Sequence, residues 1–294
     1  MRNKAVIALL VIIMVAIISN AWRSQSVTVM SRAQRYLSEE LSAALGSTVS
    51  VGSVNLAGLN SIVLTDIVLT DRRGEIVAAS PKIVVTYNPL RLLTGEAPIS
   101  AIREISINRP DLHLVEDQDG QWNIKEFFDQ PRSDQGEGFG GRIQILNGRA
   151  FISKPEGRWE LEQINGQLDF AAWPAVKVSL TAKQQETALE LSGTANSDGA
   201  GTFSLAATDL DIGNYLPLVD LPAAVTITDG RIRELAVTLT RKADGGVGYA
   251  GEALIAGLAG TYGEWPLSEA DGIVTFTDKQ VNLFAVTGLV AGQR

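Results

Sequence analysis

Most of this chain alternates apolar and polar residues with a period of two, and this pattern limits the fold more than any other feature. In the stretch AVKVSLTA, Val176, Val178 and Leu180 alternate with polar residues. The same pattern recurs at residues 82–87, 189–191, 203–205, 225–227, 235–239 and 281–283. Strict alternation places apolar side chains on one face of a strand and polar ones on the other. The sequence therefore predicts a mainly β protein.

A helical period appears near the N-terminus, in the stretch SRAQRYLSEELSAALGS at residues 31–47. Tyr36, Leu37, Leu41 and Leu45 are spaced three and four residues apart, and Gly46 is a favourable helix end. This spacing predicts one short amphipathic helix before the strands.

Five pairs of Asp or Asn followed by Gly interrupt the alternating segments. Such pairs are a strong hairpin signal, because both residues tolerate the positive φ of tight hairpin turns. We expect a series of hairpins with turns at Asp119-Gly120, Asn147-Gly148, Asn165-Gly166, Asp229-Gly230 and Asp271-Gly272.

Two architectures fit a sheet with one apolar face. A closed β-sandwich buries the apolar faces of two sheets against each other. An elongated, curved antiparallel sheet instead leaves them lining an open, taco-like groove, which would be a large apolar patch in need of an apolar ligand. The periodicity does not distinguish the two.

Composition excludes several classes of function. The chain has 294 residues and a net charge of −8, without the basic stripe that nucleic-acid binding needs. It contains no cysteine, which removes thiol catalysis and cysteine-based zinc sites.

An unbroken apolar run from Ala5 to Ile18 follows Arg2 and Lys4. One interpretation is a transmembrane signal-anchor at residues 1–22, just long enough to span a bilayer core. Its representative positions are Ala5, Leu10, Ile13, Ile18 and Trp22, the last at the membrane interface.

The other interpretation of the same run is a cleaved signal peptide. Ser19 and Ala21 are small residues at the spacing that cleavage after Ala21 requires. In both cases the remainder of the chain is exported.

The only histidine, His113, lies in RPDLHLVEDQDGQWNIKEFF at residues 109–128. No second histidine is present to share a metal ion with it. The DQDG stretch begins like a calcium loop, but Phe128 occupies the twelfth position, where an acidic ligand belongs. We interpret this acidic cluster as a turn and expect no metal site.

The other candidate catalytic and cofactor-binding residues also lack the sequence context that their function needs. The carboxylate pairs Asp66/Asp71 and Asp209/Asp211 stand in turn-like contexts, where such residues usually form turns. The stretch GEGFGG lacks the strand before it and the helix after it that a dinucleotide loop needs. We expect neither an enzyme nor a cofactor.

One long segment resembles a known family. Its features are an apolar pair before an acidic residue and a Gly turn (Leu69 to Gly74), the Tyr87-Asn88-Pro89 strand end, LRLLTG, ISINRPDLHL and DGQWN. Later stretches INGQLDF, TDLDIGNYLPL and PLSEADGIVTF continue the pattern. In this order they resemble the N-terminal part of the TamB/AsmA-like bacterial envelope proteins.

The resemblance implies a protein anchored in the bacterial inner membrane by a single pass, with the bulk in the periplasm. Its β-groove would carry phospholipid toward the outer membrane, with the acyl chains inside. The family is also tied to outer-membrane β-barrel assembly and protein secretion with a BamA-like partner. The chain looks like the first part of a longer protein, so contact with that partner would need a missing C-terminal part.

These considerations give an expected organisation. It comprises an anchor at 1–22, an amphipathic helix at 23–46, an AsmA/chorein-like β unit at 47–130, a linker at 131–141 and groove repeats at 142–294. We expect the groove lining to consist of alternate strand residues: Ile83, Val85, Ile105, Ile107, Leu112, Leu114, Ile143, Ile145, Val176, Val178, Leu189, Leu191, Leu235 and Val237.

Overall fold

The computed structural model describes residues 27–93, 98–124, 139–155, 157–214 and 225–290. The described part of the chain is mainly β, with 68% of it in strands. The chain forms two compact units, residues 1–176 and 177–294. The predicted anchor at 1–22 and most of the predicted linker lie outside the described residues.

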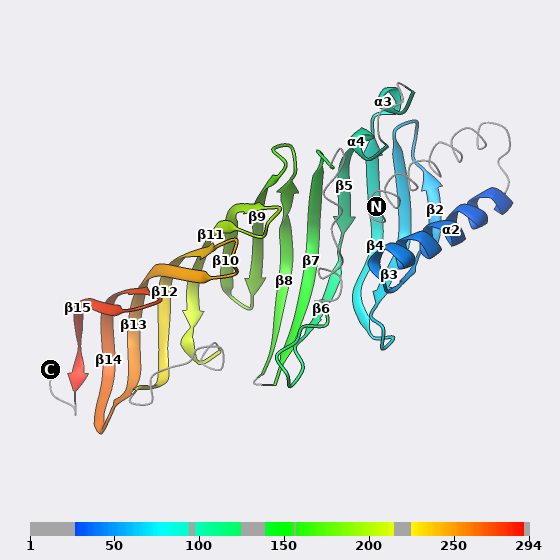
Figure 1. The fold of residues 1–294 in the computed structure, drawn as a ribbon. Helices are drawn as coiled ribbons and strands as arrows, with labels where there is room; N and C mark the ends of the chain where they lie inside the picture. The colour runs from blue at the N-terminus through cyan, green and yellow to red at the C-terminus, as the bar shows by residue number, and fades with distance from the viewer. Residues whose placement is uncertain (1–26, 94–97, 125–138, 156, 215–224, 291–294) are drawn as a thin grey trace. The chain divides into compact units, whose positions relative to one another are not determined.

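Unit 1 contains the described α-helices and a mixed sheet (Figure 1). Its elements are α2 (Val27–Leu45), β1 (Thr48–Ser50), β2 (Ser53–Leu56), β3 (Ser61–Thr70), β4 (Ile76–Tyr87), α3 (Pro89–Leu93), α4 (Pro98–Ala101), β5 (Ile102–Asn108), β6 (Asp111–Val115), β7 (Arg142–Lys154) and β8 (Gly157–Asp169). The sheet order is β1-β3-β4-β5-β7-β8, with β2 beside β3 and β6 between β4 and β7.

Unit 2 is a strand-by-strand antiparallel sheet. Its elements are β9 (Ala175–Gln184, which begins at the end of unit 1), β10 (Thr187–Asn196), β11 (Gly201–Asp211), η1 (Ile212–Asn214), β12 (Val225–Arg241), β13 (Val247–Tyr262), β14 (Trp265–Thr277) and β15 (Val281–Val290). From β10 to β15 each strand pairs with the next one in sequence. The predicted serial hairpins are therefore confirmed here.

The pairing in unit 1 departs from a purely antiparallel sheet at one place. Strands β5 and β6 both run parallel to β7, with the same offset on either side of Arg109-Pro110. They act as one strand with a break, because Pro110 has no N–H to give to the ladder. The 26 residues between β6 and β7 are long enough for the crossover that a parallel pair requires.

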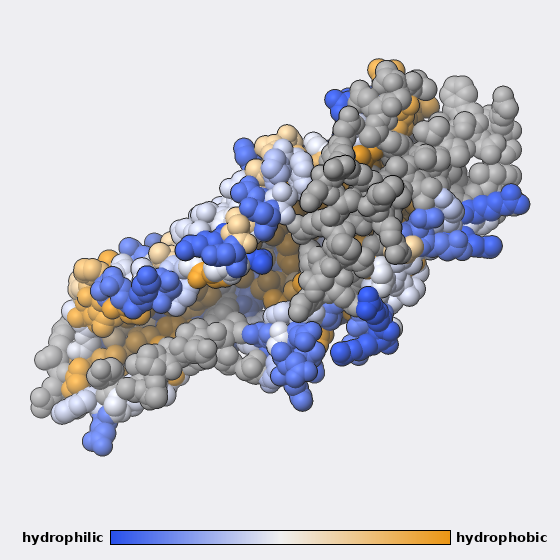
Figure 2. Space-filling model, in the orientation of Figure 1, coloured by the Kyte–Doolittle hydropathy of each residue, from blue (hydrophilic) through white to orange (hydrophobic). Residues whose placement is uncertain are grey.

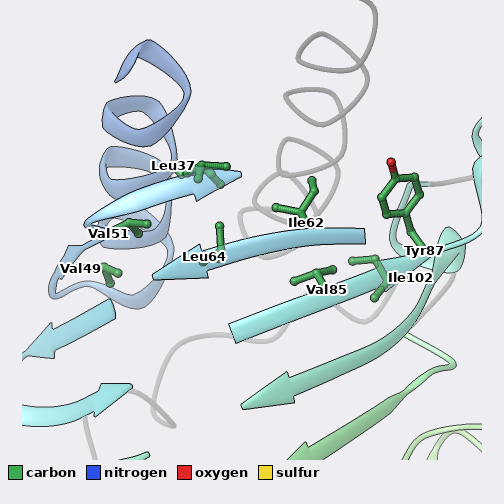
Figure 3. Close-up of a cluster of buried hydrophobic side chains, with 9 residues drawn as sticks. Leu37, Val49, Val51, Ile62, Leu64, Val85, Tyr87 and Ile102 are labelled. Carbon is green, nitrogen blue, oxygen red and sulfur yellow. The ribbon is translucent and has the colours of Figure 1, made fainter. Parts of the chain in front are cut away.

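Helix α2 packs on the unit 1 sheet at β1 and β2 and contributes to the main hydrophobic core. The helix confirms the predicted amphipathic segment, and Gly46 follows it with a φ of 66°. Leu37 on α2 is 3% exposed and packs over a cluster that includes Val51, Ile62 and Leu64 (Figure 3). A buried Leu of this kind contributes about 2 kcal/mol or more to folding.

Four of the five predicted Asx-Gly hairpin turns are wrong. Only Asp119-Gly120 forms a turn, closed by the Gly120 N–H donating to Asp117 O at 3.0 Å. The pairs at 147, 165, 229 and 271 lie inside β7, β8, β12 and β14. The pairing registers shift beside them, so they form β-bulges.

The hairpins of unit 2 turn at other residues. Gly199 and Gly245 have positive φ and close the β10–β11 and β12–β13 turns. Tight turns and some kinds of bulge both contain a left-handed residue, so the Asx-Gly residue type does not distinguish a turn from a bulge.

Candidate functional site

The apolar side chains of unit 2 line up in rows across the sheet. Directly opposed residues of paired strands share a face, so the registers define these rows. One row is Leu189, Ala207, Leu235, Ala253, Val274 and Leu283. The next is Leu191, Leu205, Val237, Gly251, Phe276 and Val281. The structure thus brings the predicted pairs Leu189/Leu191 and Leu235/Val237 onto one continuous face.

This face is unevenly buried, since Ala207 and Ala253 are 3% and 5% exposed whereas Leu283 in the same row is 65% exposed. Along β10 the apolar Leu189 and Leu191 are intermediate in exposure, while Glu190 and Ser192 between them are exposed. In the part of unit 2 that is described, the extensive contacts of each strand are with its neighbours in the sheet and, for β12, with η1. Figure 2 shows hydrophobic atoms gathered in a band over β12–β14. The face therefore carries apolar surface that no second described layer of the unit covers.

Glycines on this face leave space that aromatic side chains of the neighbouring strands occupy. A Cβ built on Gly251 would lie 2.6 Å from the ring of Phe276 on the next strand. A Cβ on Gly193 would likewise lie 2.8 Å from the ring of Phe203. The two aromatic rings thus lie over glycines, as happens where an aromatic covers a bare position in a sheet.

The strands of unit 2 bend, and the bend changes which residues face the apolar side. On β11 the apolar face is made by Phe203, Leu205 and Ala207, then Thr208 and Asp209 are both exposed, and burial resumes at Leu210. Asp209 has a φ of 55°. One residue in this conformation shifts the period-two pattern by one, so both arms of the strand keep their apolar side chains on the same face.

Such shifts also occur on β12, β13 and β14. Strand β12 has register shifts around Asp229 and Arg231, Gly257 on β13 has a φ of 61°, and Glu269 on β14 has a φ of 53°. The Gly257 N–H donates to Asp271 Oδ1 at 3.1 Å, which joins the bends of β13 and β14. In Figure 1 the upper ends of β12 and β13 turn away from the line of their strands.

Unit 1 has its own row of bends. On β8 the pattern shifts at Gln163, which has a φ of 51° and is the second of two exposed residues in succession. On β7 it shifts at Asn147, with a φ of 53°, whose N–H donates to Asn165 Oδ1 at 2.8 Å. The break at Arg109-Pro110 lies in the same row, because the Arg109 N–H donates to Leu146 O at 2.7 Å.

The predicted lining residues of unit 1 also form rows. Ile83 is opposite Ile107, which is opposite Ile145. Val85, Ile105 and Ile143 form the parallel row. Val85 is 8% exposed and belongs to the core next to α2, and Ile83 and Ile105 pack against that core. This part of the predicted lining is therefore covered within unit 1.

Beyond the break, Leu112 and Leu114 pair with Ala150 and Ile152. Between them His113 stacks on Phe151, with ring centroids 4.9 Å apart. Arg149 forms two hydrogen bonds with Asp111, at 2.9 and 2.8 Å, and this partner raises the pKa of the guanidinium. His113 thus belongs to a stacked, ion-paired surface.

The remaining predicted lining residues, Val176 and Val178, lie on β9, and both are half-buried. Sequence reasoning missed Ala253, Val274 and Phe276. Ala253 was overlooked because its side chain is small, and the run GIVTF around Val274 and Phe276 does not alternate. The sequence feature that could have identified Val274 and Phe276 is their spacing of two residues, which continues back to Gly272.

Two of the four carboxylates singled out in the sequence, Asp71 and Asp211, accept hydrogen bonds from backbone N–H groups. Asp71 Oδ1 accepts the Arg73 and Glu75 N–H groups at 2.8 and 2.9 Å, and Asp211 Oδ1 accepts Gly213 N–H at 3.0 Å. Asp66 has a φ of 51° within β3. In the described ranges, no three His, Cys, Asp or Glu residues gather where they could hold a metal ion.

Within the described residues, no helix is long and apolar enough to cross a membrane. The predicted anchor positions are not among those residues. Comparison with protein-family models, curated proteins and solved structures found no match to this chain.

Proposed function

We propose that this chain is a lipid-transfer module, anchored in the bacterial inner membrane, that carries phospholipid along the apolar face of its sheet. The observation that carries the proposal is the shift of the alternating pattern at each bend. If a strand bent at such a residue without a shift in its alternating pattern, the part beyond the bend would present its polar side chains on the apolar face. Keeping both arms apolar, while Leu189 and Leu191 stay half-exposed and Leu283 exposed, is a property of a surface that holds an apolar ligand.

The energetics suit acyl chains. Moving one CH₂ from water to an apolar surface gains about 0.8 kcal/mol, so a 16-carbon chain gains on the order of 10 kcal/mol. Rows of Leu, Val, Ala and Phe offer no polar group that would hold a headgroup in one place. A lipid would therefore move along such a face without a deep energetic trap.

The resemblance to TamB/AsmA-like proteins supports the same proposal and adds its setting. On that basis we propose an anchor at residues 1–22, with the bulk of the chain in the periplasm and the outer membrane as the receiving membrane. No step of this function requires catalysis.

Site-specific photocrosslinking in cells tests the proposal. The probe replaces Val237, and its neighbour Thr238, which lies on the exposed polar face, is the matched control. We expect phospholipid adducts at position 237 and none at 238. Protein adducts alone at 237, or equal lipid adducts at both positions, would refute an apolar face that holds lipid.

A second candidate function is a scaffold for outer-membrane β-barrel assembly. The observation in its favour is β15, which among described strands pairs only with β14 and exposes 65% of Val281 and of Leu283. Such an edge accepts an incoming strand. Phe284→Lys should then impair barrel assembly while lipid adducts at position 237 persist.

A further inference from the structure

One end of the unit 1 sheet combines exposed apolar side chains with arginines. It is the end where β3, β5 and β7 begin and β4 and β8 finish, and it comprises residues 57–61, 87–93, 98–104, 139–142 and 168–174, here called the rim. Leu59 and Leu90 are each 68% exposed, and Trp173 is 51% exposed. These are the large apolar side chains that the fold leaves most open in unit 1.

Hydrogen bonds connect the rim into one surface. Tyr87 Oη donates to Leu59 O at 3.0 Å, and Asn88 N–H donates to Ala101 O at 2.8 Å. The Phe170 N–H donates to Gly141 O at 3.0 Å. Phe170 in turn stacks on Trp173, with ring centroids 6.5 Å apart. Leu59 and Trp173, although distant in sequence, thus belong to the same edge.

A hollow lies in the middle of the rim. It has a volume of about 420 Å³ and is lined by Asn88, Arg91, Ser100, Ile102, Arg103, Gly140 and Gly141. Arg91 Nη1 donates to Ser100 O at 3.0 Å, which holds the guanidinium beside the hollow. Two arginines on one hollow are suited to a phosphate, which guanidinium groups bind with paired hydrogen bonds.

The charge of the rim contrasts with that of the chain. Its described residues carry Arg91, Arg103 and Arg142 against Glu104 and Asp169, which is 3 − 2 = +1, whereas the whole chain carries −8. Arg142 and Asp169 pair at 3.5 Å. At the opposite end of the same strands, the described residues carry five carboxylates, at positions 71, 75, 116, 117 and 119, and four cations, at positions 72, 73, 154 and 158, which is 4 − 5 = −1.

We infer that the rim binds the surface of a lipid bilayer, with a lipid phosphate in the Arg91–Arg103 hollow. Leu59, Leu90 and Trp173 enter the interface, where exposed apolar and indole side chains gain most. Anionic headgroups favour this end, where the described residues sum to +1, over the opposite end, where they sum to −1. The inference goes beyond transport along the apolar face, because it concerns where unit 1 meets a membrane.

Fluorescence quenching of the full chain in vesicles tests the inference. The chain has no cysteine, so Leu90→Cys and Trp173→Cys each give a single labelling position for an environment-sensitive dye. Ile76→Cys is the matched control, since Ile76 is 49% exposed and begins β4, the strand that ends at the rim. The vesicles contain phosphatidylglycerol and phosphatidylcholine with a quencher attached to the acyl chains.

We expect a blue shift and quenching at positions 90 and 173 and neither at 76. Equal quenching at all three positions, or none at 90 and 173, would overturn the inference. Quenching should also fall in vesicles of phosphatidylcholine alone and in an Arg91→Glu, Arg103→Glu variant. Unchanged quenching in phosphatidylcholine alone would refute the headgroup contact even if that variant fails to fold. The lipid adducts at position 237 give an independent readout, so either proposal can fail without the other.

Discussion

The ring of Phe276 occupies the space that a side chain on Gly251 would need. The two residues are directly opposed on β14 and β13, and a Cβ on Gly251 would also meet Ala236 O at 2.6 Å. Glycine at this position is therefore a packing requirement of the apolar face.

Gly251→Val should destabilise unit 2. Overpacking of this kind costs about 1–3 kcal/mol, because Phe276 or the strand must move. Gly248→Val on the same strand is the control, since a Cβ there meets nothing within 4 Å. Thermal unfolding of both variants checks the prediction, and equal transition temperatures would contradict it.

Charges on the apolar face should expel lipid. In the variant with Leu191→Asp and Val237→Asp, both carboxylates lie in the row that passes through Leu205. A charge facing acyl chains is strongly unfavourable, so retention should fall by roughly tenfold or more. Mass spectrometry of co-purified phospholipid measures the loss.

The matched control for lipid retention is Ser192→Asp with Thr238→Asp, which adds the same charge to exposed positions of the same strands. This control should retain lipid at the level of the unmodified chain. Loss from both variants alike would show that charge, and not the face that carries it, determines retention.

The bend of β11 should depend on the backbone at Asp209. With a φ of 55°, Asp209→Gly should be close to neutral, whereas Asp209→Val should cost about 1–3 kcal/mol because a β-branched residue disfavours positive φ. Denaturant unfolding of the two variants measures the difference. Similar midpoints would mean that the bend does not need a left-handed residue.

The hydroxyl of Tyr87 should contribute to stability. Tyr87 is 1% exposed and donates to Leu59 O, so Tyr87→Phe should lose about 1 kcal/mol. Burial also raises the pKa of the phenol. The unfolded chain therefore releases this proton first, and the stabilisation disappears as the pH rises above about 10.

Chemical denaturation at neutral and alkaline pH checks both statements about Tyr87. The difference in unfolding free energy between the unmodified chain and Tyr87→Phe should shrink at alkaline pH. A difference that stays constant or grows would contradict the raised pKa.

Much of the fold could be predicted from the alternating pattern. It predicted the strands of unit 2 and the shared face of Leu189 and Leu235, because the side-chain period of a strand is fixed by its backbone. The helix at α2 followed from its spacing and from Gly46. The core that α2 forms with Val85 was not foreseen, since contacts between distant segments leave no local periodicity.

The bends were misread for a physical reason. Asp229-Gly230 and Asn147-Gly148 have the residues of a hairpin turn, but they serve as bulges. The sequence did contain the distinguishing sign. Ile105 and Ile107 stand at odd positions and Leu112 and Leu114 at even ones, so the apolar period shifts by one across Arg109-Pro110.

These shifts also govern how the length of the chain can change over evolution. Adding or removing one residue within a strand arm would exchange its two faces, and the apolar row would end there. A hairpin loop has no such restriction. Length variation among related chains should therefore be confined to loops, or occur within strands in steps of two residues.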